Sequence, residues 1–453
     1  MINSVVIDSR LARPGDLFVA FQGDKADGHE HAADAFENGA IAALVEKPVS
    51  SDLMAVDLRS DVPDETLDIQ NGGPIYIVVE STLLALQKLG QRWRERFPLV
   101  RVIGITGSVG KTTTKELTHA VLCQQFETLK SEGNYNNEIG LPLTLLALRP
   151  KHERVILEMG MYTAGEISLL CELAKPHIGV ITIVGSVHME WLGSIEAIAA
   201  AKQELVEMLP PAPDGIAILN KDDPLVMAMA DHTDARILTY GLDSSADLWA
   251  DNIVSMGLDG IRFAIHHGQE SLSVQVPLLG RHSVHTALRA AAVGPVEGMK
   301  WEAIVAGLHA LTSQLRLVAV PGPRNSVILD DTYNSSPESA VAALNLLGDL
   351  EGRRIAVLGD MLELGPVEEV SHRLIGRRVK DVAQFLIVVG KLGRLIGEEA
   401  KHAGMPSEHV YLLDTAEEAV DTLNQVVEQG DVILVKGSHG AHLDTIVAEL
   451  GRG

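Results

Sequence analysis

The sequence predicts an α/β protein of three domains: a small α/β N-terminal domain, a central P-loop domain of the ATPase kind built on a parallel sheet, and a C-terminal Rossmann-like domain. The chain has 453 residues, about three times a typical domain of roughly 150 residues. Short Val- and Ile-rich runs alternate with helical patterns, which is typical of parallel sheets covered by helices. The pattern changes near residues 80 and 313, which predicts domains at 1–80, 81–313 and 314–453.

The first 80 residues form a small unit that a helix links to the next domain. A polar stretch from Pro48 to Pro74 predicts a long loop. Ser81 stands where a helix N-cap is expected, and apolar residues follow it at helical spacing. The predicted strands are Leu17 to Phe21, Ile41 to Val45 and Ile75 to Val79, and the helical stripe is Leu86, Leu89, Trp93 and Phe97.

Two further series of strands and helices predict the second and third domains. Between them, a stretch from Asp247 to Pro277 with period-two pieces predicts an antiparallel appendage, and Arg281 to Ala292 predicts a helix. The predicted strands of the second domain are Arg101 to Thr106, Arg154 to Met159, Ile178 to Val184, Ile216 to Leu219 and Ile237 to Thr239, and those of the third are Val327 to Leu329, Ile355 to Leu358, Phe385 to Val389, Val410 to Leu413 and Val432 to Val435.

Composition and charge argue against a disordered protein, a nucleic-acid-binding protein and a membrane protein. Hydrophobic residues make up 46% and charged residues 22% of the chain, as in folded globular proteins. The 37 Lys and Arg against 61 Asp and Glu give a net charge of −24, which repels nucleic acids and anionic membranes. No apolar run approaches the roughly 18 residues of a membrane span, and the start lacks a signal-peptide pattern. We expect a cytoplasmic monomer with no nucleic-acid partner and no membrane insertion.

A glycine-rich turn in the second domain predicts a phosphate-binding site. It lies between a buried strand and a helix, and reads Gly107-Ser108-Val109-Gly110-Lys111-Thr112-Thr113. The full GxxxxGK[ST] pattern fails at one position, because Ile105 stands where its first glycine would be. The physical requirements are met, since glycines let backbone N–H groups close around phosphates and the helix N-terminus favours an anion. Lys111 would neutralise charge, and Thr112 can ligate Mg²⁺.

Two polar residues follow buried strands at the same predicted edge of the sheet. Glu158 ends the run Val155 to Leu157, and His188 follows the strand Gly179 to Val184 by a short loop. Parallel sheets bind ligands at the carboxyl ends of their strands, and Mg²⁺ prefers oxygen ligands. Glu158 is equally well explained as a solvated strand-end acid, and a single His is more often structural. Their place beside the glycine-rich turn makes both of them candidates for a metal site.

Lys202 interrupts the apolar face of a predicted helix, Ile195 to Leu209. The other positions of the apolar stripe hold apolar residues, and Lys202 occupies the one position where the expected apolar residue is missing. Two interpretations stay open. In the first, the ammonium of Lys202 extends to a carboxylate at the sheet edge. In the second, its amine reacts with CO₂ to give a carbamate, which would be an oxygen donor for a metal.

Polar turns follow several strands of the third domain. Asp331 and Asn334 lie between the strand Val327 to Leu329 and a helix that begins at Pro337, where they can contact a ribose, an adenine ring or a metal. Lys436 and Ser438 follow the last strand. Turns of this kind are common, so the pattern alone assigns no ligand.

Taken together, these motifs resemble the three-domain Mur ligases of peptidoglycan synthesis. The resemblance rests on Ile105 to Thr113 and on three N-terminal segments: Asp8-Ser-Arg10, Pro14-Gly-Asp-Leu-Phe-Val-Ala-Phe21 and Asp27-Gly-His29. Within the family, three more segments resemble the members that add D-alanyl-D-alanine: Glu132 to Leu146, Asp330 to Pro337 and Gly359 to Gly365. Matches fall in all three domains, so the resemblance covers most of the chain.

The resemblance implies an ATP-dependent amide-bond ligase that joins D-alanyl-D-alanine to UDP-N-acetylmuramoyl-tripeptide through an acyl phosphate. It implies ATP, Mg²⁺ and a carbamylated Lys202. It also implies roles for individual residues. Catalysis would use Lys111, Lys202, His188 and Arg316; the nucleotide would contact Gly107 to Thr113, Asp331 and Asn334; Mg²⁺ would bind Thr112, Glu158, His188 and Lys202; and the substrates would contact Ser9, Arg10, Asn134, Asn136, Asn137, Lys436 and Ser438.

Two segments depart from the family pattern. The family's His-Asn-x-x-Asn segment appears as His282-Ser283-Val284-His285-Thr286, so two amides that can bind adenine are replaced. The usual Lys-Gly-Ser-Arg appears as Lys436-Gly-Ser-His439, which exchanges a permanent cation for one that titrates near neutrality.

Three alternative functions stay open at this point. The first is the same chemistry with another amino-acid or peptide acceptor. The second is a P-loop switch ATPase, which would need neither Lys202 in an apolar stripe nor a third domain facing the nucleotide. The third is a nucleotide-binding scaffold without turnover, which the changes at Ser283, Thr286 and His439 keep open. Phosphate release that requires both the UDP-sugar peptide and the dipeptide would distinguish the ligase from the other two.

Overall fold

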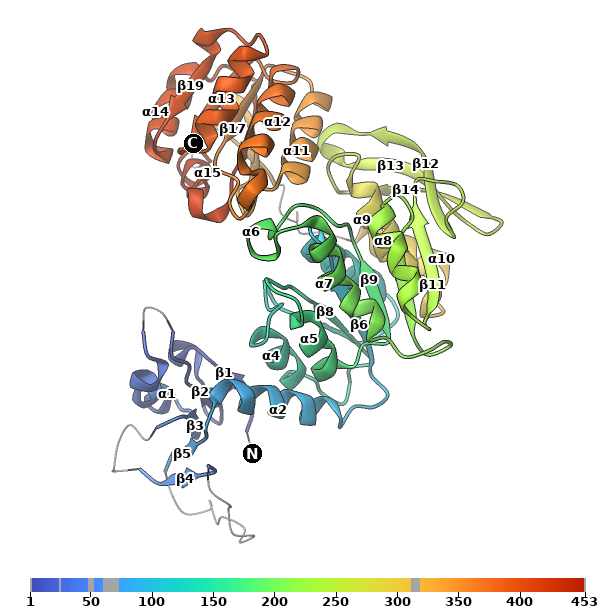
Figure 1. Ribbon diagram of the computed structural model, residues 1–453, viewed down its shortest axis with the longest axis vertical. Helices are drawn as coiled ribbons and strands as arrows, with labels where there is room; N and C mark the ends of the chain where they lie inside the picture. Colours follow the sequence, from blue (N-terminus) through green and yellow to red (C-terminus); the bar gives the residue numbers. More distant parts are fainter. Residues whose placement is uncertain (1, 24–25, 48–52, 60–72, 311–317, 452–453) are drawn as a thin grey trace.

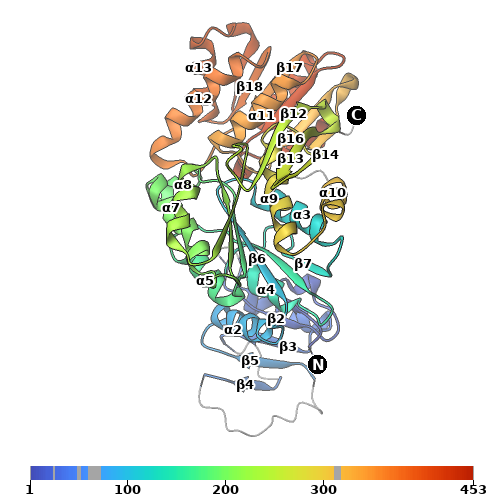
Figure 2. The ribbon, with the colours of Figure 1, turned by 90° about the vertical axis from the view of Figure 1, so that its right-hand side faces the viewer.

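The computed structural model describes residues 2–23, 26–47, 53–59, 73–310 and 318–451. In this part of the chain, three β-sheets follow one another along the long axis of the molecule (Figures 1 and 2). The N-terminal sheet and the C-terminal sheet lie at opposite ends, and the second sheet lies between them. The α/β class is therefore confirmed. The exact domain limits at 80 and 313 stay a prediction, and residues 311–317, which include Arg316, lie outside the described residues.

The N-terminal sheet is parallel, with the strand order β1-β2-β3-β5-β4. The prediction that Pro48 to Pro74 is only a loop is wrong, because β4 (Ala55–Asp57) lies in it and pairs with β5. This edge strand has three residues and buries only Val56. A strand this short shows no visible alternation in the sequence. The other elements are β1 (Val5–Val6), β2 (Leu17–Val19), β3 (Ala42–Val45), β5 (Ile75–Val78), α1 (Ala32–Glu37) and the 3₁₀ turns η1 (Ser9–Leu11) and η2 (Gly28–His31).

Helix α2 (Thr82–Arg94) joins the first sheet to the second. The hydroxyl of Ser81 accepts a hydrogen bond from the backbone N–H of Leu84, which confirms the predicted N-cap. At its other end, the buried Arg94 side chain donates to the carbonyls of Ala174, Phe97 and Val100. These bonds fix the end of α2 to the loops at the base of the central domain.

The central sheet has nine strands in the order β14-β13-β12-β11-β10-β9-β6-β8-β7. The strands from β7 to β12 are parallel, and β12, β13 and β14 form the predicted antiparallel appendage. The edge strand β7 was not predicted, because it is short and only half-buried. The bounds are β6 (Arg101–Thr106), β7 (Thr128–Lys130), β8 (Arg154–Glu158), β9 (Ile178–Ile181), β10 (Ile216–Asn220), β11 (Arg236–Gly241), β12 (Leu248–Ser255), β13 (Ile261–His267) and β14 (Glu270–Val276).

Helices cover both faces of this central sheet. On one face, Ile103 and Ile105 of β6 pack with the apolar residues of α3, α9 and α10. On the other face, Val102 packs with residues of α4, α5 and α7. Since successive residues of a strand point to opposite faces, a strand covered on both sides needs an apolar interior, as Val102 to Ile105 of β6 provide. The bounds are α3 (Lys111–Leu122), α4 (Gly140–Leu146), α5 (Glu166–Ala174), α6 (Met189–Leu192), α7 (Ile195–Glu207), α8 (Pro224–Ala228), α9 (Ser283–Val296) and α10 (Trp301–His309).

The C-terminal sheet has six strands in the order β15-β16-β20-β17-β18-β19. Its strands are parallel except for β15, an unpredicted edge strand that runs antiparallel to β16. Helices again cover both faces. The bounds are β15 (Val318–Pro321), β16 (Val327–Asp331), β17 (Arg354–Leu358), β18 (Phe385–Val389), β19 (Val410–Leu413), β20 (Val432–Lys436), α11 (Pro337–Asp349), α12 (Glu368–Lys380), α13 (Gly393–His402), α14 (Ala416–Val426) and α15 (Asp444–Leu450). Among the described residues, no helix has the length and apolar character needed to cross a membrane.

Candidate functional site

The glycine-rich turn lies at the carboxyl end of β6, and its geometry requires both glycines. Gly107 has φ +142°, and a Cβ there would lie 1.8 Å from the hydroxyl oxygen of Thr182. Gly110 has φ +85° and caps α3 at its N-terminus. Both backbones therefore adopt conformations that only glycine takes without strain. The loop, Gly107 to Thr113, brings the positive end of α3 to the sheet edge, as a phosphate site needs.

The loop is held by the segment that follows the neighbouring strand β9. The backbone N–H of Ser108 donates to the carbonyl of Ile183, and its hydroxyl bonds both the carbonyl and the N–H of Gly185. The Lys111 ammonium donates to the carbonyl of Gly107 at 2.8 Å. These bonds keep the loop in shape, and Val109 and Thr113 at its outer side are half-buried.

Glu158 ends β8 beside this loop, as its position in the sequence predicts. Its side chain is 1% exposed, which contradicts the alternative of a solvated acid. Oε1 accepts hydrogen bonds from the Thr112 hydroxyl at 3.2 Å and from the Asn136 amide at 3.0 Å. Oε2 is buried and has no hydrogen-bond partner. The structure thus brings together three of the predicted residues from three separate segments.

Lys115 is a residue of this site that the sequence reasoning missed. It is fully buried on α3, its ammonium donates to the carbonyl of Gly133 at 2.8 Å, and it lies 3.4 Å from Oε2 of Glu158. Lys115 therefore ties the phosphate helix to β8 and to the loop that carries Asn136. The signal that could have found it is a lysine one turn after Lys111, at a position of α3 that faces the sheet.

The donor set fits a magnesium ion that also binds phosphates. The buried Oε2 of Glu158 and the hydroxyl of Thr112 are hard oxygen donors. No cluster of three His, Cys, Asp or Glu side chains able to hold a metal exists in the described part of the chain. Mg²⁺ usually takes one or two protein ligands and completes its shell with phosphate and water.

Lys202 is 1% exposed in the apolar face of α7, as the stripe predicts. No described residue forms a hydrogen bond or ion pair with it, so the interpretation that it extends to a carboxylate is wrong. Burial, and then the positive charge of Lys111, lower the pKa of Lys202 well below its usual value. The structure thus places a strongly perturbed amine close enough to the phosphate loop to interact with Lys111.

His188 lies where the central and C-terminal domains meet. It has φ +70°, caps the short helix α6, and places Nδ1 3.1 Å from Oε2 of Glu363 in the C-terminal domain. This neighbour lowers the pKa of the Glu363 carboxyl. Two residues earlier, the N–H and hydroxyl of Ser186 donate to Glu338 of α11, each at 3.1 Å. The loop after β9 therefore contacts the phosphate loop on one side and the C-terminal domain on the other.

The carboxyl edge of the C-terminal sheet brings Asp331, Asn334 and Lys436 together. Asp331 and Lys436 are paired in the parallel register of β16 and β20. The ammonium of Lys436, which is 2% exposed, lies 2.8 Å from Oδ2 of Asp331 and donates to the carbonyl of Asn334. Ser438 accepts a hydrogen bond from the N–H of Leu362. The sequence predicts this group of residues but not their mutual contacts.

The predicted substrate residues occupy two other places. Ser9 is buried in η1, and Arg10 beside it is exposed and forms an ion pair with Asp8 at 2.6 Å. Asn134 and Asn137 are exposed in the loop before α4, close in sequence to the Asn136 that binds Glu158. The N-terminal pair therefore lies on a different domain from the phosphate loop.

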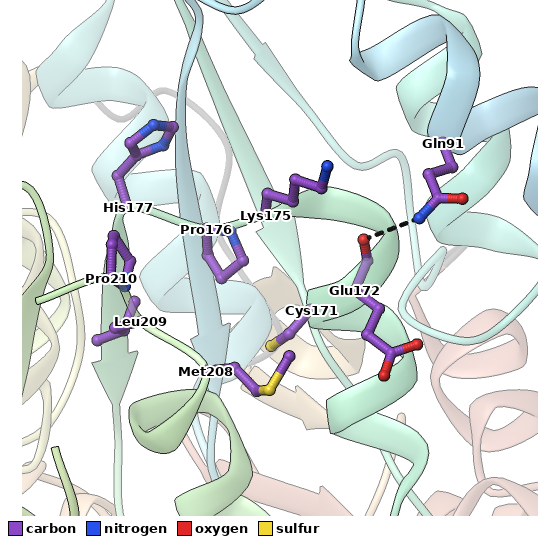
Figure 3. A pocket seen from close by; sticks show the side chains of 9 residues that line it. All are labelled: Gln91, Cys171, Glu172, Lys175, Pro176, His177, Met208, Leu209 and Pro210. Carbon is purple, nitrogen blue, oxygen red and sulfur yellow. Dashed lines mark hydrogen bonds between the residues drawn. The ribbon is translucent and has the colours of Figure 1, made fainter.

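A cavity of about 600 Å³ lies elsewhere in the central domain. Figure 3 shows its lining, including His177 just before β9 and Pro210 in the loop that leads to β10. It is therefore at the amino ends of these strands, the edge opposite to the phosphate loop. Burial raises the pKa of the Cys171 thiol in its wall to about 12, so this thiol is not a nucleophile. The cavity takes no part in the site described above.

Known proteins resemble this chain over nearly its whole length. Family models of the Mur ligases match three successive regions: the family's catalytic domain at residues 1–94, the middle domain at 105–294 and the glutamate ligase domain at 315–439. A relative from Synechocystis is 37% identical over 99% of this chain and 92% of its own length. Relatives from Bacillus subtilis and Escherichia coli are 37% and 33% identical over 99% of the chain, and over 93% and 94% of their own lengths.

The chain therefore belongs to the Mur ligase family and is an ATP-dependent ligase. The three relatives are each named as a UDP-N-acetylmuramoyl-tripeptide–D-alanyl-D-alanine ligase. Among solved structures, MurF from Acinetobacter baumannii is similar with a TM-score of 0.86 and 29% identity, covering all of this chain and 94% of that one. MurF from Thermotoga maritima, solved in complex with ADP, has a TM-score of 0.81 and 26% identity over 99% and 97% of the two chains.

Proposed function

We propose that this chain joins D-alanyl-D-alanine to UDP-N-acetylmuramoyl-tripeptide at the expense of ATP. The observation that carries the proposal is that relatives with this named activity align over nearly the whole chain, including all three sheets. The carboxylate of the tripeptide attacks the γ-phosphate of ATP and ADP leaves, which gives an acyl phosphate. The amine of the dipeptide then attacks the acyl carbon, and phosphate leaves.

In this proposal the phosphate loop positions ATP and neutralises its charge. Backbone N–H groups between Gly107 and Thr113, apart from that of Ser108, and the ammonium of Lys111 would face the phosphates. Mg²⁺ held by Thr112 and Glu158 would supply further charge neutralisation during phosphoryl transfer. His188 is a third candidate ligand, and its contact with Glu363 connects it to the C-terminal domain.

Lys202 is the residue that we propose to be carbamylated. The lowered pKa of its amine favours the neutral form, which is the nucleophile that adds CO₂. The new N–C bond forms as one C=O bond of CO₂ opens, and the nitrogen loses a proton to water, which leaves a carbamate. Its negative charge would be attracted to Lys111 and to a metal, both of which repel an ammonium. The burial of Lys202 on α7, with no ion pair to an acid among the described residues, supports this chemistry, because such surroundings do not stabilise an ammonium.

The other predicted contacts complete the proposed substrate path. The UDP end lies at Ser9 and Arg10, the sugar and peptide face Asn134, Asn136 and Asn137, and the C-terminal domain contributes the remaining groups. These are Asp331 and Asn334 at the nucleotide, Arg316 at its terminal phosphate, and Lys436 and Ser438 at the peptide end. We place the reaction in the cytoplasm and assign it to the monomer.

The proposal is tested by phosphate release with purified chain, ATP and Mg²⁺. Release should require both the UDP-linked tripeptide and D-alanyl-D-alanine. Turnover with a different amine in place of the dipeptide would identify another acceptor, and release without either substrate would indicate a switch ATPase. Lys111→Ala should remove ligation with an unchanged circular dichroism spectrum, because this side chain contributes charge neutralisation rather than packing.

A further inference from the structure

Arg289 is a buried arginine behind the phosphate loop. It lies on α9, in the otherwise apolar run Ala287 to Val293, and is only 3% exposed. Helix α9 packs directly against the phosphate helix α3, and the two lie side by side in Figure 2. A charged side chain in this position requires a compensating group, since arginine is almost never fully buried without one.

The guanidinium of Arg289 reaches the phosphate loop. Its Nε donates to the hydroxyl of Thr114 at 2.9 Å, and a terminal nitrogen donates to the hydroxyl of Thr286 at 2.7 Å. The Thr114 hydroxyl in turn donates to the carbonyl of Gly110 at 2.6 Å. A Cβ on Gly110 would lie 2.8 Å from the same terminal nitrogen, so the loop's last glycine also leaves room for the guanidinium.

The positive charge of Arg289 has no acidic partner in the described part of the chain. Its two hydrogen bonds to described residues go to neutral hydroxyls, and the aromatic ring of Tyr240 lies 6.0 Å from its carbon Cζ. The same charge adds to the effect of burial in lowering the pKa of His282, to about 4, and of His285. Among the described residues, no carboxylate forms an ion pair with Arg289, so its charge stays without an acidic partner beside the loop.

We propose that Arg289 is a further determinant of nucleotide binding, a fixed positive charge that attracts the phosphates across Gly110. It acts as a positioning residue through the loop, and this inference rests on the proposed ATP site. A bound polyphosphate supplies the negative charge that Arg289 lacks within the chain. The adjoining Ser283 and Thr286 replace the two amides of the family pattern, so this chain draws its nucleotide affinity more from the phosphates than from the base.

The test compares three ligands in calorimetric titrations without metal: ADP, adenosine and inorganic pyrophosphate. We expect Arg289→Met to weaken ADP and pyrophosphate by about tenfold or more and to leave adenosine within about twofold. Arg289→Lys should recover part of the loss, because it keeps the charge without both hydrogen bonds. Arg281→Met, in the exposed turn just before the same helix, is the matched control and should bind all three ligands as the wild type does.

Unchanged ADP and pyrophosphate affinities in Arg289→Met would overturn the inference, as would equal losses for ADP and adenosine. If the melting temperature of the free protein is unchanged or higher in Arg289→Met, the charge of Arg289 serves phosphate binding and not the stability of the fold, which supports the inference. A lower one, with phosphate binding that Arg289→Lys does not restore, means that the role is packing and the inference is wrong. If the wild type binds pyrophosphate but not ADP, the proposed ATP site fails, and the pyrophosphate series alone decides the role of Arg289.

Discussion

Two lysines, one in the central domain and one in the C-terminal domain, are similarly buried but stand in opposite electrostatic surroundings. Lys436 of the C-terminal domain is 2% exposed, pairs with Asp331 and donates to a backbone carbonyl. Lys202 of the central domain is 1% exposed, has no partner among the described residues and is repelled by Lys111. Burial alone therefore does not determine what a lysine does. The neighbouring charge determines whether it stays an ammonium that holds structure or becomes a neutral amine available for chemistry.

The largest expected effect is on activity, at Lys202. Lys202→Ala should lower ligation by about 1000-fold, because a group that acts in phosphoryl transfer is removed. Short carboxylates such as acetate should restore part of the activity by filling the vacated space, and depletion of bicarbonate should slow the wild type. Phosphate release measures all three. A fully active Lys202→Ala would refute the carbamate proposal.

Lys436 should show the contrary pattern, with a large effect on stability. Lys436→Met removes the ammonium that lies 2.8 Å from the largely buried carboxylate of Asp331, and the loss of a charge pair of this kind destabilises by about 3–5 kcal/mol. Hydrogen exchange of β16 and β20 measures the loss. The double variant with Asp331→Asn should recover part of it. The comparison fails if Lys202→Met destabilises the central domain by as much, because no carboxylate among the described residues pairs with Lys202.

The pH dependence of stability sharpens the same contrast. The pKa of Lys202 is lowered in the folded protein, so between that value and the unfolded value of 10.5 the unfolded chain binds more protons. Stability should therefore rise with pH through this window, by about 1.4 kcal/mol per unit for this group. Lys202→Met lacks this increase. Hydrogen exchange of α7 in CO₂-free buffer measures the difference, and parallel profiles for the two proteins would contradict the assignment.

The smallest effect concerns the contact that joins the two domains. Glu338→Ala removes the acceptor of both Ser186 hydrogen bonds and should weaken the interface by about 1 kcal/mol. Glu338→Gln is the matched control, because its amide oxygen still accepts. Small-angle scattering should show a wider distribution of domain positions in the alanine variant alone. Equal profiles for both variants would mean that Ser186 and Glu338 do not hold the domains.

Local patterns predicted much of the fold and part of the site. The phosphate loop follows from a strand, two glycines and a helix within a dozen residues, and Lys202 from its place in an apolar stripe. The edge strands β4, β7 and β15 were missed, since short strands with few inward residues carry no clear period. Lys115 and Arg289 were missed because their partners, Glu158 and Thr114, are distant in sequence.

The sequence by itself determined the family, the three-domain α/β plan and the residues able to do chemistry. These depend on residue type and short spacing, which sequence contains directly. Only the tertiary structure decided which charges are paired: Lys115 with Glu158, Lys436 with Asp331, and Lys202 and Arg289 with no acid among the described residues. Electrostatic energy depends on distance in space and on exclusion of water. Both are set by the packing of elements that the chain brings together from far apart.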